Sequence, residues 1–203
     1  MKVITLEIAD FTEACQRLFK HVMDSGFIPE IIVGIRTGGE FVALNMWSTL
    51  HTGEFSEGSR PSPAVAMVEL HRPTTSMKQG LKGFLSHMPL WILNGIRMVE
   101  SMALRWHRIS PEDITARKAM LTESLSPTLK CLKGRKVLIV DDAVDSGATM
   151  LAVAEALREA NPEAEIRTAA ITVTTPKPLI TPDYSMYKDL IRFPWSMDAK
   201  KVK

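Results

Sequence analysis

The sequence predicts an α/β fold, in which helices cover both faces of a central parallel sheet in a doubly wound arrangement. Continuous apolar, largely β-branched runs at 31–35 and 137–140 are typical of strands buried on both faces of such a sheet. Segments with apolar residues three and four positions apart alternate with these runs, as helices that cover a sheet do. A length of 203 residues fits one domain, so we expect a single unit over 1–203.

The composition excludes several classes of protein. Hydrophobic residues make up 45% and charged residues 24%, which is close to average globular usage and excludes a disordered or collagen-like chain. The net charge of +2 is too small to predict binding along a nucleic-acid backbone. The two cysteines give no disulfide framework, and no long apolar stretch follows a basic start. We therefore expect a cytosolic protein with neither nucleic acid nor a membrane as partner.

The first third of the chain predicts alternating strands and helices. A short strand at the start is followed by a helix that ends at Ser25-Gly26. The buried strand 31–35, a Gly pair, an apolar helix through Phe41 and Trp47, and a strand at 64–70 follow, with a Gly, Ser and Pro-rich surface loop at 52–63. The first helix has apolar residues three and four positions apart: Phe11, Ala14, Leu18, Val22 and Met23.

Residues from about 76 to 128 break this alternation and predict a helical insertion. Apolar residues recur at helical spacing from Leu81 to Trp106, which predicts one long helix or two helices broken near Pro89. The segment is too short and too polar to span a bilayer. A buried or dimer-forming helix and a helix that docks on a membrane surface or a partner both remain open. Ser110-Pro111 then predicts the start of a further helix.

The last third resumes the alternation. It predicts a strand at 137–140, a helix from Met150 to about Asn161, and a strand at 166–173. Three prolines exclude regular structure over 174–182, and the chain then ends in an aromatic, basic tail.

The strongest functional signal follows the strand 137–140. Asp141 and Asp142 stand at its carboxyl end, where open α/β sheets bind ligands, and at a frayed end both carboxylates can accept hydrogen bonds from one sugar diol. A turn of small residues then opens a helix, so backbone N–H groups and hydroxyls can bind phosphate without Lys or Arg. The pattern predicts a phosphorylated pentose, and its structural alternative is a helix cap beside a solvated loop. This turn consists of Asp145, Ser146, Gly147, Ala148 and Thr149.

The string 137–149 resembles the phosphoribosyl pyrophosphate signature of the type I phosphoribosyltransferases, residue for residue in type. The resemblance implies that Asp141 and Asp142 hold the ribose hydroxyls and that 145–149 bind the 5′-phosphate. It also implies a small hood built from the termini, to which about 174–198 contribute.

A second motif resembles the pyrophosphate loop of the same family. The strand 31–35 ends in Arg36, Thr37, Gly38 and Gly39, and the glycines allow the backbone to approach an anion closely. The resemblance implies a cis peptide at Arg36-Thr37 and a role for Arg36 in neutralising the pyrophosphate.

Asp145 indicates which kind of base would accept the phosphoribosyl group. In the xanthine-guanine and hypoxanthine branch of the family, an Asp at this spacing lies beside N7 of the base and accepts its proton, which implies a catalytic role for Asp145. The sequence Arg192-Phe193-Pro194-Trp195 is also similar to that branch. Two positions depart from it: Lys177 lies about two places beyond the Lys that reads the purine, and Leu190 stands where a stacking aromatic is expected. The base-binding candidates are Lys177, Tyr187 and Trp195, with Tyr184 as an alternative stacking residue.

The reaction that the resemblance implies is a Mg²⁺-dependent transfer of the 5-phosphoribosyl group from phosphoribosyl pyrophosphate to a ring nitrogen of a nucleobase, a purine by its pattern. Pyrophosphate is released, Asp142 is the candidate Mg²⁺ ligand, and a homodimer or higher homo-oligomer is expected. Two alternatives stay open. One is a regulator that binds phosphoribosyl pyrophosphate or a nucleotide and controls a nucleic-acid or protein partner, and the other is an interaction protein whose inserted helices dock a partner.

Overall fold

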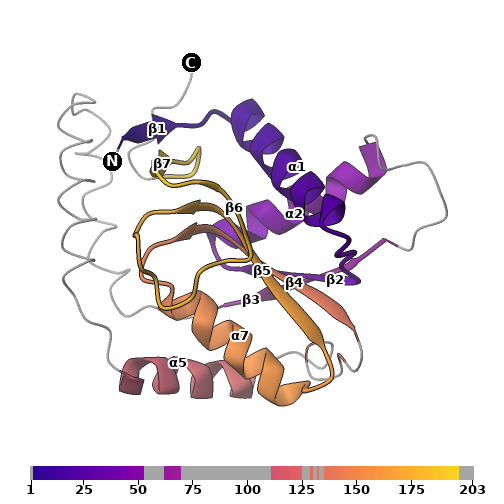
Figure 1. Cartoon of the computed structure of the whole chain (residues 1–203), viewed down its shortest axis with the longest axis vertical. Coiled ribbons are helices and arrows are strands. Elements are labelled where there is room, and N and C mark those ends of the chain that lie inside the picture. The colour runs from indigo at the N-terminus through magenta and orange to yellow at the C-terminus, as the bar shows by residue number, and fades with distance from the viewer. Residues whose placement is uncertain are drawn as a thin grey trace.

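The computed structural model describes residues 2–52, 62–69, 111–124, 129, 132 and 135–196, and these form a sheet with helices on both faces (Figure 1). The helices are α1 (Ile8–Asp24), α2 (Gly38–Thr52), α5 (Pro111–Ser124) and α7 (Ala148–Ala160). The strands are β1 (Val3–Thr5), β2 (Ile31–Ile35), β3 (Ala64–Val68), β4 (Lys136–Val144), β5 (Glu165–Val173), β6 (Tyr184–Tyr187) and β7 (Leu190–Arg192).

Within these residues, β3-β2-β4-β5-β6 form a five-stranded sheet in which all neighbours are parallel. Consecutive residues of the two central strands face opposite sides of this sheet. Ile32 and Leu138 belong to the apolar core under α1 and α2, whereas Val33 and Ile139 belong to the core under α5 and α7. The continuous apolar runs of the sequence are therefore explained by burial on both faces.

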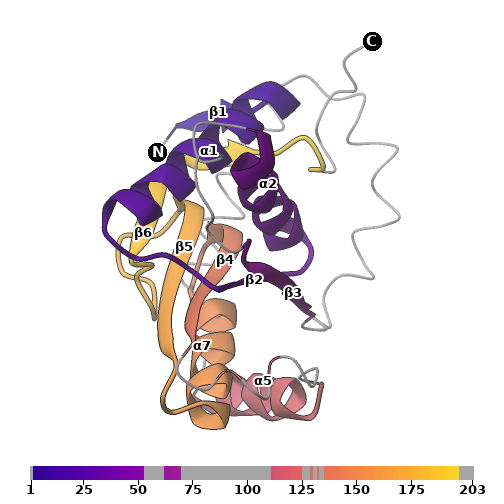
Figure 2. The ribbon, with the colours of Figure 1, turned by 90° about the vertical axis from the view of Figure 1, so that its right-hand side faces the viewer.

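Figure 2 shows α1 and α2 on one side of the sheet and α5 and α7 on the other. This arrangement confirms the predicted doubly wound α/β fold. The predicted loop 52–63 and the predicted insertion up to residue 110 lie almost entirely outside the described residues, while the helix predicted to start at Ser110-Pro111 is α5. Within the described ranges, no helix has the length and apolar content that crossing a membrane requires.

One strand differs from its prediction at the point that matters most. The sequence predicts a strand that ends at Val140, with the two acids on a frayed end, but β4 continues to Val144. Its pairing with β2 stops at Val140, opposite Gly34, whereas its pairing with β5 continues through Asp141, opposite Ala170, to Val144. The acids therefore stand on a strand that is held on one edge only, and its other edge is open to the turn after β2.

The two ends of the chain meet outside the main sheet. β1 and β7 form a separate two-stranded parallel sheet, in which Val3 pairs with Leu190. Beyond β1, the Leu6 N–H donates to the Arg192 carbonyl over 3.0 Å, and the Arg192 guanidinium donates to the Thr5 hydroxyl over 3.0 Å. Neither β6 nor β7 is predicted from the sequence, because each is short and is defined by its pairing, β6 with β5 and β7 with β1.

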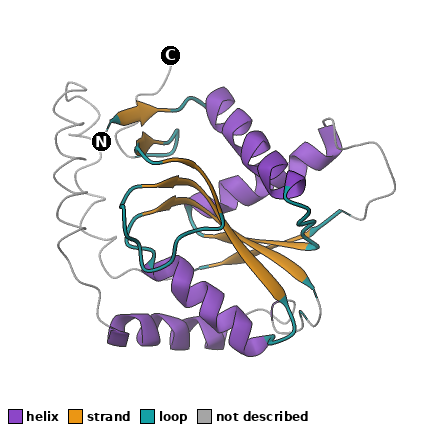
Figure 3. Ribbon diagram, viewed as in Figure 1, coloured by secondary structure: helices purple, strands orange, loops and turns teal. Residues whose placement is uncertain are grey.

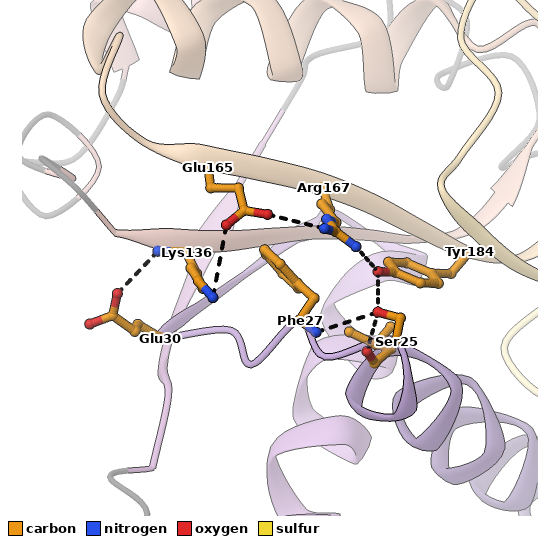
Figure 4. Close-up of polar contacts among 8 residues, drawn as sticks. Ser25, Phe27, Glu30, Lys136, Glu165, Arg167 and Tyr184 are labelled. Atoms are coloured by element: carbon orange, nitrogen blue, oxygen red, sulfur yellow. Dashed lines mark hydrogen bonds and ion pairs between the residues drawn. The ribbon is translucent and has the colours of Figure 1, made fainter.

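A polar network fastens the amino ends of the strands, at the edge of the sheet opposite the acids (Figure 4). The Tyr184 hydroxyl lies 2.6 Å from both the Ser25 hydroxyl and Nη1 of Arg167. The Arg167 guanidinium lies 4.7 Å from the centre of the Phe27 ring and donates to Glu165. The network joins the end of α1 to β5 and β6, and it holds the Tyr184 hydroxyl away from the acids of β4.

We predict that Tyr184→Phe lowers the free energy of unfolding by about 1–2 kcal/mol, because one hydroxyl serves both Ser25 and Arg167 in a buried position. Urea unfolding of the variant measures this loss. Tyr187→Phe is the matched control on the same strand, since its ring lacks such a bond among the described residues, and it should stay within about 0.5 kcal/mol of the wild type. Equal losses in the two variants would contradict the stabilising role of the Tyr184 hydroxyl.

Candidate functional site

The turn after β2 packs directly against the acids of β4. A Cβ atom at Gly38 would lie 2.0 Å from Cγ of Asp142, and one at Gly39 would lie 2.4 Å from the Val140 carbonyl oxygen and 3.3 Å from Oδ1 of Asp141. Only glycine allows this approach, because any side chain would displace the backbone or the acids. The two motifs that the sequence analysis singled out therefore meet at one place, and the peptide Arg36-Thr37 is cis, as expected.

Each of the two acids orders the backbone that follows it. The Asp142 N–H donates to Oδ1 of Asp141 over 2.9 Å, and the Ala143 N–H donates to Oδ1 of Asp142 over 2.9 Å. The Asp141 side chain is buried, and that of Asp142 is partly buried. These bonds hold both carboxylates at the open edge of β4.

Burial raises the pKa of the Asp142 carboxyl group, and the nearby negative charge of Asp145 raises it further. Hydrogen bonds from Asp141, from the Ala143 N–H and from the Trp195 side chain act in the opposite direction. Burial prevails, so Asp142 takes up a proton at a higher pH than an ordinary aspartate.

Arg36 lies exposed at the edge of the glycine turn. Its Nε lies 3.1 Å from Oε2 of Glu40, and its Nη1 lies 3.4 Å from Oε2 of Glu69. Because the guanidinium is 45% exposed, these ion pairs are weak and can exchange with a stronger anion.

The small turn after β4 opens α7. Gly147 has a φ of +80°, which favours glycine, and the Leu151 N–H donates to its carbonyl over 2.9 Å in the first turn of the helix. The Ala148 N–H donates to the Ser146 hydroxyl over 3.4 Å. Such a helix start presents backbone donors and the positive end of the helix dipole to an anion.

The loop after β5 closes over this turn, and Figure 3 shows it in teal beyond the strand tips. The Leu179 N–H donates to the Ser146 carbonyl over 2.8 Å, and a Cβ at Gly147 would lie 3.0 Å from the Ile180 nitrogen. The loop also carries Lys177, which is exposed. It therefore forms a wall beside the turn that the sequence predicts to hold phosphate.

Sequence reasoning missed Thr174, the first residue after β5. Its hydroxyl donates to Oδ1 of Asp145 over 2.5 Å, and its N–H donates to the Val144 carbonyl over 3.0 Å. Thr174 is buried, so it fixes the orientation of the Asp145 carboxylate. Its position could have indicated this role. Thr174 follows β5, which is parallel to and next to β4, so it lies at the same edge of the sheet as Asp145.

A second missed residue is Arg117 of α5, whose Nη1 lies 3.3 Å from the Thr149 hydroxyl. The sequence predicts that the 145–149 turn binds phosphate without Lys or Arg, but the structure places a guanidinium beside this turn. No motif or spacing points to this contact, because α5 and α7 are brought together only by the fold.

The base-binding candidates take different places. Tyr187 is partly buried in β6, where its carbonyl accepts a bond from the Thr172 hydroxyl over 3.3 Å. Tyr184 is wrong as an alternative stacking residue, because it is buried in the network at the opposite edge of the sheet. Trp195 lies among three other rings, with the ring of Phe41 stacked at 4.5 Å, that of Phe193 stacked at 5.0 Å, and that of Phe11 edge-on at 4.7 Å.

We predict that Gly38→Ala weakens the binding of phosphoribosyl pyrophosphate at least about tenfold, because the new methyl group would displace the Asp142 carboxylate and so remove a charged hydrogen-bond acceptor. Calorimetric titration with the donor measures the loss. The matched control is Gly26→Ala, at a φ of +83° with nothing within 4 Å of its Cβ. That control should lose stability but keep its affinity, and a wild-type affinity in Gly38→Ala would overturn the prediction.

We further predict that donor affinity falls with decreasing pH, because protonation removes an acceptor oxygen of Asp142. This fall should begin at a higher pH than it would with an ordinary aspartate, since the pKa of Asp142 is raised. The raised pKa means that the folded state binds this proton more tightly than the unfolded state, so Asp142→Asn is expected to resist urea better at pH 7. Titrations from pH 8 to pH 5 measure the first effect. Asp142→Asn serves as the control, since it retains the titration of the ligand's phosphates but should lack this step.

Comparison with known proteins supports the resemblance of the carboxyl-terminal half of the chain. Residues 104–201 match the family model of the phosphoribosyl transferase domain. A search of curated proteins found no match. The solved structures that resemble the chain include a purine phosphoribosyltransferase from Pyrococcus horikoshii Ot3, with 19% identity, a TM-score of 0.55, and coverage of 97% of this chain and 95% of that one.

Two further structures are similar. The xanthine-guanine-hypoxanthine phosphoribosyltransferase of Helicobacter pylori is 16% identical, with a TM-score of 0.56 and coverage of 97% of this chain and 95% of that one. A hypothetical protein from Neisseria gonorrhoeae with bound ppGpp is 14% identical, with a TM-score of 0.54 and coverage of 96% and 89%. At these identities the likeness is one of fold, while the domain match supports the prediction of an enzyme of this class. Residues 104–201 therefore match the phosphoribosyl transferase domain, and the fold of the chain is similar to that of solved phosphoribosyltransferases.

Proposed function

We propose that the protein transfers the 5-phosphoribosyl group from phosphoribosyl pyrophosphate to a ring nitrogen of a purine base and releases pyrophosphate. The observation that carries this proposal is the contact between the Gly38-Gly39 turn and the acids of β4, beside the start of α7. Three segments suited to pyrophosphate, ribose and phosphate thus adjoin one another at the carboxyl edge of the sheet, as the three parts of the donor do.

Each segment takes one part of the donor. Asp141 and Asp142 accept hydrogen bonds from the ribose hydroxyls. The turn after β2 receives the pyrophosphate on its backbone, and the exposed Arg36 exchanges its carboxylate partners for the more highly charged ligand. The 5′-phosphate occupies the start of α7, at Asp145, Ser146, Gly147, Ala148 and Thr149. The pyrophosphate segment consists of Arg36, Thr37, Gly38 and Gly39.

Magnesium fits this site as a companion of the donor. The described residues contain no group of three or more His, Cys, Asp or Glu side chains that could hold a metal ion, so these residues alone offer no complete cage. Mg²⁺ is commonly bound by one or two carboxylates together with substrate phosphates, and Asp142 supplies a carboxylate of the right kind. When bound, the ion would neutralise charge on the departing pyrophosphate.

Catalysis then depends mainly on electrostatics. Ribosyl transfer develops positive charge at the ribose carbon that loses pyrophosphate, and the carboxylates of Asp141, Asp142 and Asp145 stabilise that charge. Thr174 donates to Oδ1 of Asp145, and we assign the other oxygen, Oδ2, to the proton on the base. The exposed Lys177 and the aromatic residues Tyr187 and Trp195 are the candidates for binding the base. Purine is the preferred acceptor because solved purine phosphoribosyltransferases share the fold.

The decisive experiment measures pyrophosphate release from phosphoribosyl pyrophosphate and Mg²⁺ with a panel of purines, pyrimidines and other nitrogen heterocycles. We predict release with a 6-oxopurine, and a loss of at least about a hundredfold in Asp145→Asn, because the proton acceptor is gone. Donor affinity should persist in that variant. Asp24→Asn, an exposed acid at the end of α1, is the matched control and should keep full activity.

Release with a pyrimidine alone would replace the purine assignment but keep the reaction. Wild-type turnover in Asp145→Asn would refute the role of Asp145. No release with any acceptor, from a protein that binds no donor, would refute the proposed function.

A second candidate is a regulator that binds phosphoribosyl pyrophosphate or a nucleotide. The observation that favours it is the Neisseria gonorrhoeae protein of similar fold, which has ppGpp bound. Calorimetry with ppGpp and the release assay together separate the candidates: binding without turnover favours the regulator. The homodimer or higher homo-oligomer and the cytosolic location stay predictions, and sedimentation of the purified protein tests the first.

A further inference from the structure

Resting on the proposed function, we propose that Arg117 of the inserted helix α5 binds the 5′-phosphate of the donor. The observation that carries this inference is the bond from Nη1 of Arg117 to the Thr149 hydroxyl, over 3.3 Å. Thr149 is the second residue of α7 and belongs to the turn that receives the phosphate. A segment that the sequence analysis treated as an insertion thereby becomes part of the donor site.

The guanidinium has bonding capacity to spare. It carries five N–H donors in a planar fork, a geometry that suits two oxygens of one phosphate. Among the described residues, its single hydrogen bond is to the Thr149 hydroxyl. Arg117 can therefore hold Thr149 and still donate to an anion at the start of the helix.

The fold positions this side chain in advance. Ile114, Arg117, Lys118 and Leu121 recur at helical spacing on one face of α5. That face packs along α7: Leu121 is fully buried in the core on this side of the sheet, Ile114 packs against the same core, and the Lys118 ammonium pairs with Glu159 of α7. Arg117 is partly buried between these anchors, so little side-chain freedom remains to be lost when a ligand binds.

The positive charge of Arg117 would favour an anion at this position. The acids of β4 and Asp145 place negative charge beside a ligand that is itself an anion. The positive end of a helix dipole amounts to only about half a charge. A guanidinium at Thr149 offsets the repulsion at the phosphate end of the donor, where Arg36 on the opposite motif is assigned to the pyrophosphate end.

A purely structural role for Arg117, as a fastener between α5 and α7, makes a different prediction, and Lys118 provides the comparison. It is the neighbouring cation on the same face, and its partner Glu159 lies near the far end of α7. Lys118→Gln removes a positive charge and an α5–α7 contact without touching the phosphate turn.

The experiment compares Arg117→Gln, Arg117→Lys and Lys118→Gln by calorimetry with phosphoribosyl pyrophosphate, ribose 5-phosphate and pyrophosphate with Mg²⁺. We expect Arg117→Gln to bind the first two at least about tenfold more weakly and to bind pyrophosphate as the wild type does. Arg117→Lys should be intermediate, because it keeps the charge but loses the fork. Lys118→Gln should keep all three affinities, and in turnover Arg117→Gln should raise KM for the donor more than it lowers kcat.

The outcomes separate this inference from the proposed function. If the wild type binds neither phosphoribosyl pyrophosphate nor ribose 5-phosphate, the proposed function itself fails. If it binds them and Arg117→Gln binds them equally well, only the role of Arg117 fails. Equal losses in Arg117→Gln and Lys118→Gln would show that Arg117 merely docks the helix, which also overturns the inference.

Discussion

The close approach of two backbones at the open edge of β4 is the constraint on which the site depends. β2 ends before β4 does, so the chain must turn away there, and it turns directly over the edge that β2 leaves unpaired. Gly38 and Gly39 let that turn come within van der Waals distance of Asp141 and Asp142. Continued pairing with β5 keeps the acids on a rigid strand while one edge stays open. The proposed binding of ribose and pyrophosphate side by side requires both properties.

The same packing has an electrostatic consequence. Bringing a glycine turn and Trp195 onto Asp142 takes its carboxylate out of water, and Asp145 stands close enough to raise its pKa further. A negative charge on Asp142 is therefore unfavourable in this position, and the hydroxyl donors of the proposed ribose ligand would stabilise it. Carboxylates that are placed close together for binding are expected to lower the stability of the folded protein.

The sequence predicts most of the fold because its strands are buried on both faces, and burial leaves a continuous apolar signature at 31–35 and 137–140. It fails where a strand is defined by its pairing partner rather than by its own pattern of residues. The extension of β4 to Val144 is set by β5, and β6 and β7 exist only through pairing with β5 and β1. At the site, local motifs identify Asp141 to Thr149, whereas Thr174 and Arg117 carry no local signature and are found only from contacts.

The place of α5 explains how a helix from the connection between β3 and β4 lies beside the turn that opens α7. The chain leaves the sheet at β3 and returns at β4, and β2 lies between these two strands. A connection between parallel strands must cross one face of the sheet, and α5 lies on the face that α7 covers. Because α7 begins just after β4 ends, a helix that packs against the first residues of α7 lies close to the 145–149 turn. A helix in this connection can thus place a side chain beside that turn, as α5 places Arg117 next to Thr149.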